Sequence, residues 1–205
     1  ASPSMAQTKA AKTGAEPGQF DLYVLALSWS PAYCADGGAK RSPEQCAAGA
    51  QKGFVVHGLW PQYADDGWPS YCRTGETDPS RGLTAAQADV FGGAGAAFYQ
   101  WKKHGRCSGL SAAGFYDLAR EAKGRVVVPE VFRGLVRDIR LEADVVEDAF
   151  LEANPGMDPE GVVVTCRAGR VQEVRVCLTK GLAFRACGAD VGRVCRGVVG
   201  MEAVR

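Results

Sequence analysis

The most continuous apolar stretch of the chain is FDLYVLALSW, residues 20–29, and a Ser-Pro step follows it. A run of this length without polar alternation is typical of a strand that is buried on both faces. GFVVH, residues 53–57, is a second strand candidate, which we expect to stop at Gly58 and Pro61. Residues 62–84 are rich in Gly, Pro, Asp and Ser, which predicts a long surface loop.

Helical patterns occupy the middle of the chain. One helix is predicted over about residues 95–107, and a second begins after Ser111, a suitable N-cap, and ends near Gly124. EVFRGLVRDI, residues 130–139, and EADVVEDAFLEANPG, residues 142–156, predict two more helices. The Asn-Pro-Gly sequence closes the last of them.

Two β-rich runs follow these helices, GVVVTCRAG at residues 161–169 and RVQEVRVCLT at residues 170–179. The short Gly-containing turn between them predicts a hairpin. Strands first, helices in the middle and strands last favour one α+β domain, which we expect over residues 20–205. Residues 1–19 are small and polar, and we expect them to be a flexible leader.

Composition limits the possible functions. The 205 residues suffice for a full core in one domain, and the net charge of +1 offers no broad basic surface for a polyanion. No run of roughly 18 or more apolar residues occurs, so no transmembrane helix is expected. The polar N-terminus without an apolar segment is typical of a secreted or periplasmic product whose signal peptide has been removed.

The chain contains 8 cysteines, and none of them forms a CxxC pair. The two histidines are not spaced as partners of nearby cysteines either, so the sequence gives little support for a zinc site. An even number of scattered cysteines favours four disulfides and an oxidising compartment, with reduced buried cysteines in a cytosolic protein as the alternative. On the order of a hundred pairings are open to eight cysteines.

The only 2 histidines stand in dense aromatic, glycine and cationic surroundings. His57 lies in FVVHGLWPQ, at the exit of the second predicted strand, and His104 lies in FYQWKKHGRC. On a helix, Gln100, Lys103 and His104 share one face, together with Cys107. Taken singly, each histidine is more often structural than catalytic, and a Lys-Lys pair is most often a solvated helix face.

Together, however, two imidazoles and an ammonium group suit the cleavage of RNA through its own 2′-hydroxyl. One imidazole takes the proton of that hydroxyl, and the other protonates the departing 5′-oxygen. A lysine stabilises the negative charge that grows on the phosphate oxygens. The RNA supplies the nucleophile, so the reaction requires no metal or cofactor.

FVVHGLWPQ resembles the first active-site motif of the ribonuclease T2 family, and FYQWKKHGRC resembles the second. YVLALSWSPAYC is similar to the first core strand and first cysteine of that family, and EVRVCLTKGLAFRAC to its C-terminal strands; the resemblance covers about Phe20 to Cys195. It implies an α+β domain with a central antiparallel β-sheet packed with several helices and four disulfides. It also implies a monomeric secretory endoribonuclease that acts on single-stranded RNA without a metal.

By this resemblance, His57 and His104 are the acid/base pair. We expect His104 to be the base and His57 the acid, with the reverse assignment left open, and Lys103 to stabilise the phosphate. The expected products are a 2′,3′-cyclic phosphate and, more slowly, a 3′-phosphate. Base binding in the family draws on residues just after the first motif, which here implies Trp60, Gln62 and Tyr63.

The second motif of the family usually reads His-Glu-Trp-x-Lys-His-Gly, and this chain has Tyr99 and Gln100 at its first two positions. The Tyr99 hydroxyl is expected to contact the substrate phosphate in place of the histidine. Because Gln100 removes an anion from beside His104, we expect a lower pKa for that histidine than in a relative with glutamate. From this we also expect a pH optimum less acidic than is usual for the family.

The family pattern further implies four disulfide pairs, of which one would tie the loop after the His57 motif to the end of the His104 helix. The pairs are Cys34–Cys46, Cys72–Cys107, Cys166–Cys195 and Cys177–Cys187.

Two functions compete with a secreted endoribonuclease. One is a T2-fold protein that binds RNA but has weakened or lost catalysis, because Gln100 and Tyr99 replace the usual glutamate and histidine. The other is a disulfide-stapled inhibitor or binding module that does not act on RNA. Retention of both His57 and His104 favours the enzyme.

Overall fold

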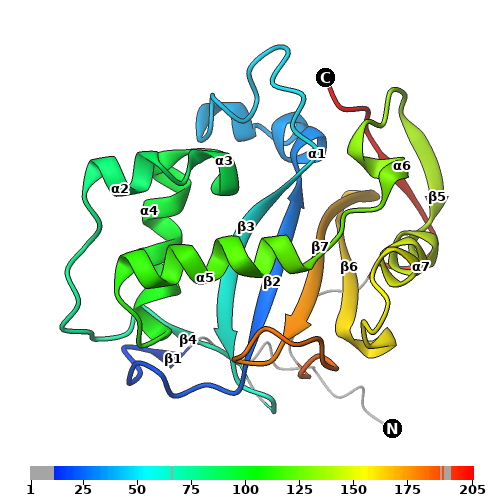
Figure 1. The fold of residues 1–205 in the computed structure, drawn as a ribbon. Coiled ribbons are helices and arrows are strands. Elements are labelled where there is room, and N and C mark those ends of the chain that lie inside the picture. The colour runs from blue at the N-terminus through cyan, green and yellow to red at the C-terminus, as the bar shows by residue number, and fades with distance from the viewer. Residues whose placement is uncertain (1–11, 66, 190, 192–194) are drawn as a thin grey trace, which may run out of the picture.

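The structure is a computed structural model that describes residues 12–65, 67–189, 191 and 195–205 (Figure 1). The strands are β1 (Lys12–Thr13), β2 (Leu22–Trp29), β3 (Phe54–Gln62), β4 (Pro69–Ser70), β5 (Ile139–Glu142), β6 (Val162–Arg167), β7 (Arg170–Leu178) and β8 (Val198–Met201). The α-helices are α1 (Ser30–Ala35), α2 (Arg81–Ala85), α3 (Ala88–Phe91), α4 (Ala94–Lys103), α5 (Ala112–Arg125), α6 (Glu130–Arg133) and α7 (Ala143–Ala153). Three short 3-10 helices are η1 (Gly38–Lys40), η2 (Gly105–Cys107) and η3 (Pro159–Gly161).

The main sheet has the strand order β3-β2-β7-β8-β5, and β6 also pairs with β7. Its pairs are antiparallel except for the short parallel contact between β7 and β8. The α+β class with a central, largely antiparallel sheet is therefore confirmed. The predicted hairpin is the β6–β7 pair.

Strand β2 lies between β3 and β7, and all eight of its residues are buried, as its apolar run predicts. Leu25, Leu27 and Trp29 point to one face and join the main hydrophobic core. Phe115 and Tyr116 of α5, which crosses the sheet in Figure 1, pack into the same core. The opposite face of β2 is left for a second layer of side chains, which includes the site described below.

Strand β3 does not end at Gly58, as the sequence predicts, but continues through Pro61 to Gln62. Pro61 is tolerated because β3 lies at one end of the strand order, where a missing N–H leaves no ladder bond unmade. Val56 pairs with Leu27 and Gly58 with Ala26, so His57 is an extra residue in a β-bulge. Bulges of this kind redirect a side chain.

The predicted helix over residues 95–107 is interrupted at His104, which is the C-cap of α4, and a 3-10 turn carries the chain on to Cys107. The next residue must be small: a Cβ on Gly105 would lie 2.6 Å from the Trp101 ring and 2.8 Å from the Phe115 ring. The prediction for α5 is confirmed, since the Ser111 hydroxyl accepts a hydrogen bond from Gly114 N at 3.2 Å.

The prediction of a helix over EVFRGLVRDI is wrong beyond its first turn. Only Glu130–Arg133 is helical, and Ile139 begins β5, which pairs with β8. Both strands are short and stabilised by pairing with each other, so local periodicity does not reveal them. The prediction of a helix closed by Asn-Pro-Gly is confirmed by α7.

Residues 1–11 of the expected leader lie outside the described residues. The remainder of it is not free: Lys12 and Thr13 pair in parallel with Pro69 and Ser70. Gly18 N also donates a hydrogen bond to the Cys107 carbonyl at 2.9 Å. The folded part of the chain therefore starts before residue 20. None of the described helices has the length and apolar character needed to cross a membrane.

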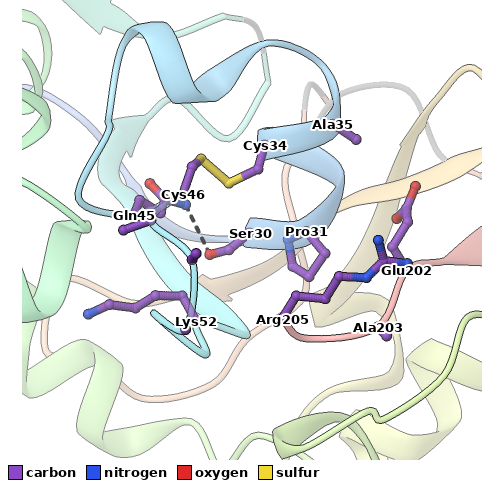
Figure 2. A pocket seen from close by; sticks show the side chains of 13 residues that line it. Ser30, Pro31, Cys34, Ala35, Gln45, Cys46, Lys52, Glu202, Ala203 and Arg205 are labelled. Atoms are coloured by element: carbon purple, nitrogen blue, oxygen red, sulfur yellow. Dashed lines mark hydrogen bonds between the residues drawn. A yellow bond between two sulfur atoms is a disulfide. The ribbon is translucent and has the colours of Figure 1, made fainter.

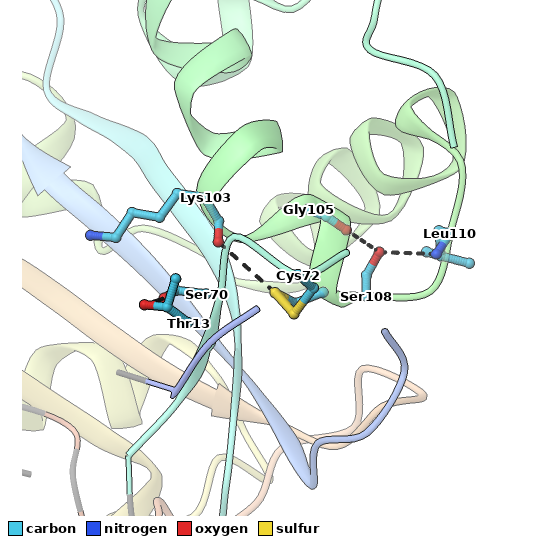
Figure 3. Close-up of a disulfide and its surroundings, with 8 residues drawn as sticks. Thr13, Ser70, Cys72, Lys103, Gly105, Ser108 and Leu110 are labelled. Atoms are coloured by element: carbon cyan, nitrogen blue, oxygen red, sulfur yellow. Dashed lines mark hydrogen bonds between the residues drawn. A yellow bond between two sulfur atoms is a disulfide. The ribbon is translucent and has the colours of Figure 1, made fainter. Parts of the chain in front are cut away.

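All four expected disulfides are present: Cys34–Cys46, Cys72–Cys107, Cys166–Cys195 and Cys177–Cys187. Figure 3 shows the surroundings of the bridge at Cys72, which lies beside the C-terminal end of α4. Close to it, Tyr71 N donates a hydrogen bond to the Lys103 carbonyl at 2.8 Å. The bridge therefore holds the segment that carries both Lys103 and His104.

Replacing both cysteines of the Cys72–Cys107 bridge by serine should lower the free energy of unfolding by about 2–5 kcal/mol, because the bridge closes a loop across a sequence separation of 35 residues. It should also shift the NMR signals of His104. The matched control is the Cys34–Cys46 bridge, whose removal should lower stability but leave the His104 signals in place. Equal displacement of these signals in the two variants would contradict the positional role.

Candidate active site

A cavity of about 390 Å³ contains both histidines of the chain. Its lining consists of Val24, His57, Trp60, Gln62, Trp68, Tyr99, Gln100, Lys103, His104 and Arg175. All of the acid/base and substrate residues expected from the sequence are therefore brought together, except Tyr63. That ring packs partly buried against the core and lies 4.7 Å beneath the Lys12 ammonium.

His57 projects from the bulge of β3, and its side chain is 46% exposed. Its Nδ1 is hydrogen-bonded to Oε1 of Glu173, a residue of β7. An ionised carboxylate has no proton to donate, so Nδ1–H is the donor. This leaves Nε2 as the nitrogen of His57 that is available to a ligand.

Glu173 is only 4% exposed and is paired on both oxygens. Its Oε2 accepts hydrogen bonds from Nε of Arg175 at 2.9 Å and from Nη2 at 2.7 Å. Burial by itself raises the pKa of this carboxyl, but the hydrogen bond and charge of His57, with those of Arg175, outweigh it and lower the pKa to about 2. Glu173 is thus an anion at any ordinary pH.

Trp60 lies between the two histidines. Its ring stacks on His104 at a centroid distance of 5.4 Å and meets His57 edge-on at 5.2 Å. Its Nε1–H donates to Gln100 Oε1 at 2.9 Å. A Cβ on Gly58 would collide with both atoms of this hydrogen bond, which explains why glycine follows His57.

His104 is 5% exposed, and its Nδ1 is buried without a hydrogen-bond partner among the described residues. Burial is the main cause that lowers its pKa well below the ordinary value, and the positive charges of Lys103 and His57 act in the same direction. The pKa of His104 is therefore low, while the expected difference from a relative with glutamate stays a prediction. The leading cause is burial, followed by the charges of Lys103 and His57.

Lys103 and Tyr99 form the more open side of the cavity. The Lys103 ammonium lies 5.9 Å from the centre of the Tyr99 ring. The side chain of Tyr99 is well exposed, and its hydroxyl accepts a hydrogen bond from the Tyr71 hydroxyl at 3.4 Å. A cation and a phenol are thus presented together to any anion that enters.

The sequence model of the ribonuclease T2 family matches residues 20–187. The chain belongs to the ribonuclease T2 family. A ribonuclease of Aeromonas hydrophila is 42% identical over 127 residues, which are 59% of this chain and 56% of that protein. A probable ribonuclease of Haemophilus influenzae is 32% identical over 120 residues, which are 53% of this chain and 44% of that protein. The chain thus spans about half the length of these curated relatives.

Solved structures support the T2 fold. An RNase-related protein from Calystegia sepium superposes with a TM-score of 0.71 at 20% identity, covering 91% of this chain and 98% of that one. RNase NT in complex with 5′-AMP superposes with a TM-score of 0.66 at 20% identity, covering 88% and 97%. At such identity the likeness concerns the fold.

Sequence reasoning missed four residues that line or contact this candidate site: Glu173, Arg175, Trp68 and Val24. A signal existed for the first two, since they occupy alternate positions of the strand and so share one face. A charged residue in the centre of a buried strand requires a partner. Nothing in the local pattern distinguishes Trp68 from an ordinary loop tryptophan.

A second cavity, of about 380 Å³, lies beside α1 and the Cys34–Cys46 disulfide (Figure 2). Its wall includes Gln45, whose Nε2 donates to the Ser30 hydroxyl at 3.0 Å. The two polar groups satisfy each other, and neither histidine lines this cavity. The second cavity therefore contains neither member of the expected acid/base pair.

Substitution Gln100→Glu should raise the pKa of His104. A carboxylate at this position can still accept the Trp60 hydrogen bond, but it adds an anion that favours the protonated imidazole. NMR titration of the ring protons measures this directly, because the full chain has only two histidines. The exposed Gln51→Glu variant carries the same charge change and should leave the titration unaltered. An unchanged or lower His104 pKa in Gln100→Glu would refute the electrostatic account.

Proposed function

We propose that this chain is an endoribonuclease that cleaves single-stranded RNA by transphosphorylation through the 2′-hydroxyl, with His104 as base and His57 as acid. The observation that carries the proposal is the contrast between two imidazoles in one cavity. His104 is buried and favours its neutral form, whereas a carboxylate lies at Nδ1 of His57. Pairs of titratable groups in opposing environments indicate which is the base and which the acid.

In the first step, Nε2 of neutral His104 takes the proton of the 2′-hydroxyl, and the 2′-oxygen attacks the phosphorus. Nε2–H of protonated His57 gives its proton to the departing 5′-oxygen, which leaves a 2′,3′-cyclic phosphate. In the slower second step the roles reverse: His57 takes a proton from water, and His104 returns one to the 2′-oxygen. The product is a 3′-phosphate, and both histidines regain their initial states.

Charge on the non-bridging phosphate oxygens is the second requirement of the reaction. The Lys103 ammonium is placed at the open side of the cavity to stabilise that charge, and the Tyr99 hydroxyl can donate to the same group. Gln100 is also a catalytic candidate from the sequence, because its amide can donate a hydrogen bond to a phosphate oxygen. Its carbonyl oxygen holds Trp60, and only its amide nitrogen is left to meet the phosphate.

Recognition of the nucleobase falls to the aromatic and amide side chains of the same cavity. Trp68 offers a surface on which a base can stack, worth about 1–3 kcal/mol per base. Trp60, which already contacts His104 and Arg175, lines the wall of the same cavity. Gln62 lines the wall beside them, and its amide can both donate and accept. Tyr63, expected to contribute, is not part of this wall.

The low pKa of His104 moves the pH–rate profile in the opposite direction to the one expected from the sequence. Whether His104 is the base or the acid, lowering its pKa moves the corresponding limb of the pH–rate profile to lower pH. The low pKa caused by burial therefore favours activity that persists into acidic solution. We withdraw the expectation of an optimum less acidic than usual. A lower pKa of His104 moves the limb of the pH–rate profile to lower pH, not to higher pH.

Four disulfides favour an oxidising compartment, which supports a secreted or periplasmic enzyme. That the enzyme works as a monomer stays part of the proposal. An RNA-binding protein without catalysis is the second candidate, and the presence of Gln100 and Tyr99 is the observation in its favour. The asymmetric environments of His57 and His104 support the enzyme, since binding alone does not require them.

Each of the variants His57→Ala and His104→Ala should lose about 10²–10⁴-fold in the rate of RNA cleavage, because each removes one proton-transfer group. The assay is digestion of single-stranded RNA in the presence of EDTA, with phosphorus NMR to detect 2′,3′-cyclic ends. The exposed Glu121→Gln variant on α5 should retain the rate of the parent chain. Binding of RNA by a parent chain that produces no cyclic ends would establish the second candidate instead.

A further inference from the structure

We infer that Glu173 is the positioning residue that makes His57 the acid, and that Arg175 is committed to holding Glu173 rather than to binding the substrate. The inference rests on the proposed function, because it presupposes that His57 protonates the leaving oxygen. Glu173 itself exchanges no proton with the RNA and forms no bond to it.

The sheet topology allows the contact. His57 is on β3 and Glu173 is on β7, and β2 runs between these strands. At this level β2 contributes only small side chains: Ser28 pairs with Glu173, and Ala26 pairs with Arg175. The bulge at His57 and the small residues of the middle strand together let the imidazole reach across to the carboxylate.

Arg175 lines the cavity, but its guanidinium N–H groups donate hydrogen bonds to other residues of the protein. Nε and Nη2 bind Glu173 Oε2, and Nη1 donates to the Val191 carbonyl. The guanidinium also lies 5.0 Å from the centre of the Trp60 ring. This arrangement fixes Glu173 on the side away from His57 and braces Trp60 at the same time.

The importance of Glu173 follows from the charges of the groups that surround His57. The groups that face this histidine are Glu173 and Arg175 from β7, Trp60 from β3, and Lys103 and His104 at the end of α4. Among the described residues that line the cavity there is no aspartate or glutamate.

Lys103 and Arg175 are cations among these groups, and Glu173, behind His57, is the anion that offsets their charge. The second motif places Gln100 where its family has a glutamate, so this offset cannot come from that position. The hydrogen bond to Nδ1 also fixes the ring so that Nε2–H faces the leaving group.

The experiment compares two substrates that share the 2′-hydroxyl but differ in the leaving group. A UpA dinucleotide has a poor leaving group that requires an acid, whereas uridine 3′-(4-nitrophenyl phosphate) releases a stabilised phenolate that does not. General-acid catalysis contributes about 10²–10⁴-fold, so Glu173→Gln should slow UpA cleavage by about 10- to 100-fold. It should leave cleavage of the aryl ester nearly unchanged. In addition, the alkaline limb of the UpA pH–rate profile should move to lower pH.

Matched variants separate this role from a structural one. His57→Ala should show the same dependence on the leaving group, and His104→Ala should lose activity on both substrates. Glu173→Gln leaves the Arg175 cation without its partner and is expected to lower the melting temperature. The double variant Glu173→Gln/Arg175→Met removes both charges and should recover stability without recovering UpA cleavage.

Equal loss on the two substrates in both Glu173 variants, with His57→Ala still selective, would overturn the inference alone. A His57→Ala variant without leaving-group dependence would overturn the assignment of His57 as the acid, and with it the proposed function on which the inference rests. Glu121→Gln, which removes an exposed carboxylate far from the cavity, should behave as the parent chain in both assays.

Discussion

The hydrogen bond from Trp60 to Gln100 is the contact on which the site depends, because it joins the edge strand β3 to helix α4 across 40 positions of sequence. Once this bond forms, the Trp60 ring covers His104 and meets His57, so both imidazoles share one cavity. Gly58 must lack a side chain for the bond to exist. The Cys72–Cys107 bridge then holds the end of α4 from the other side.

The two histidines obtain different chemistry from their different surroundings, although the side chains are the same. His104 sits at a helix end, buried and beside a cation, where protonation is disfavoured. His57 sits in a bulge, half exposed, with an anionic Glu173 at its inner nitrogen. The sheet supplies this anion from a strand far away in sequence, so a change inside the second motif, such as Gln100, does not leave the acid without a counter-charge.

Much of the fold follows from local pattern: the apolar run of β2, the N-cap of α5 and the β6–β7 hairpin are all evident in the sequence. The short strands β5 and β8 are not, because each is stabilised by pairing with the other and not by its own periodicity. The site is predictable as far as residues lie within the two motifs. Glu173 and Arg175 enter it through strand order and register, which no single stretch of the chain encodes.

The most direct test of the central claim is a crystal structure of the full chain with a dinucleotide that carries 2′-fluorine in place of the hydroxyl. The account predicts His104 Nε2 beside the 2′-position and His57 Nε2 within hydrogen-bond distance of the 5′-oxygen, with Lys103 at the phosphate. Exchange of the two histidines relative to the sugar and the leaving oxygen would contradict it. So would a dinucleotide bound away from the cavity that contains them.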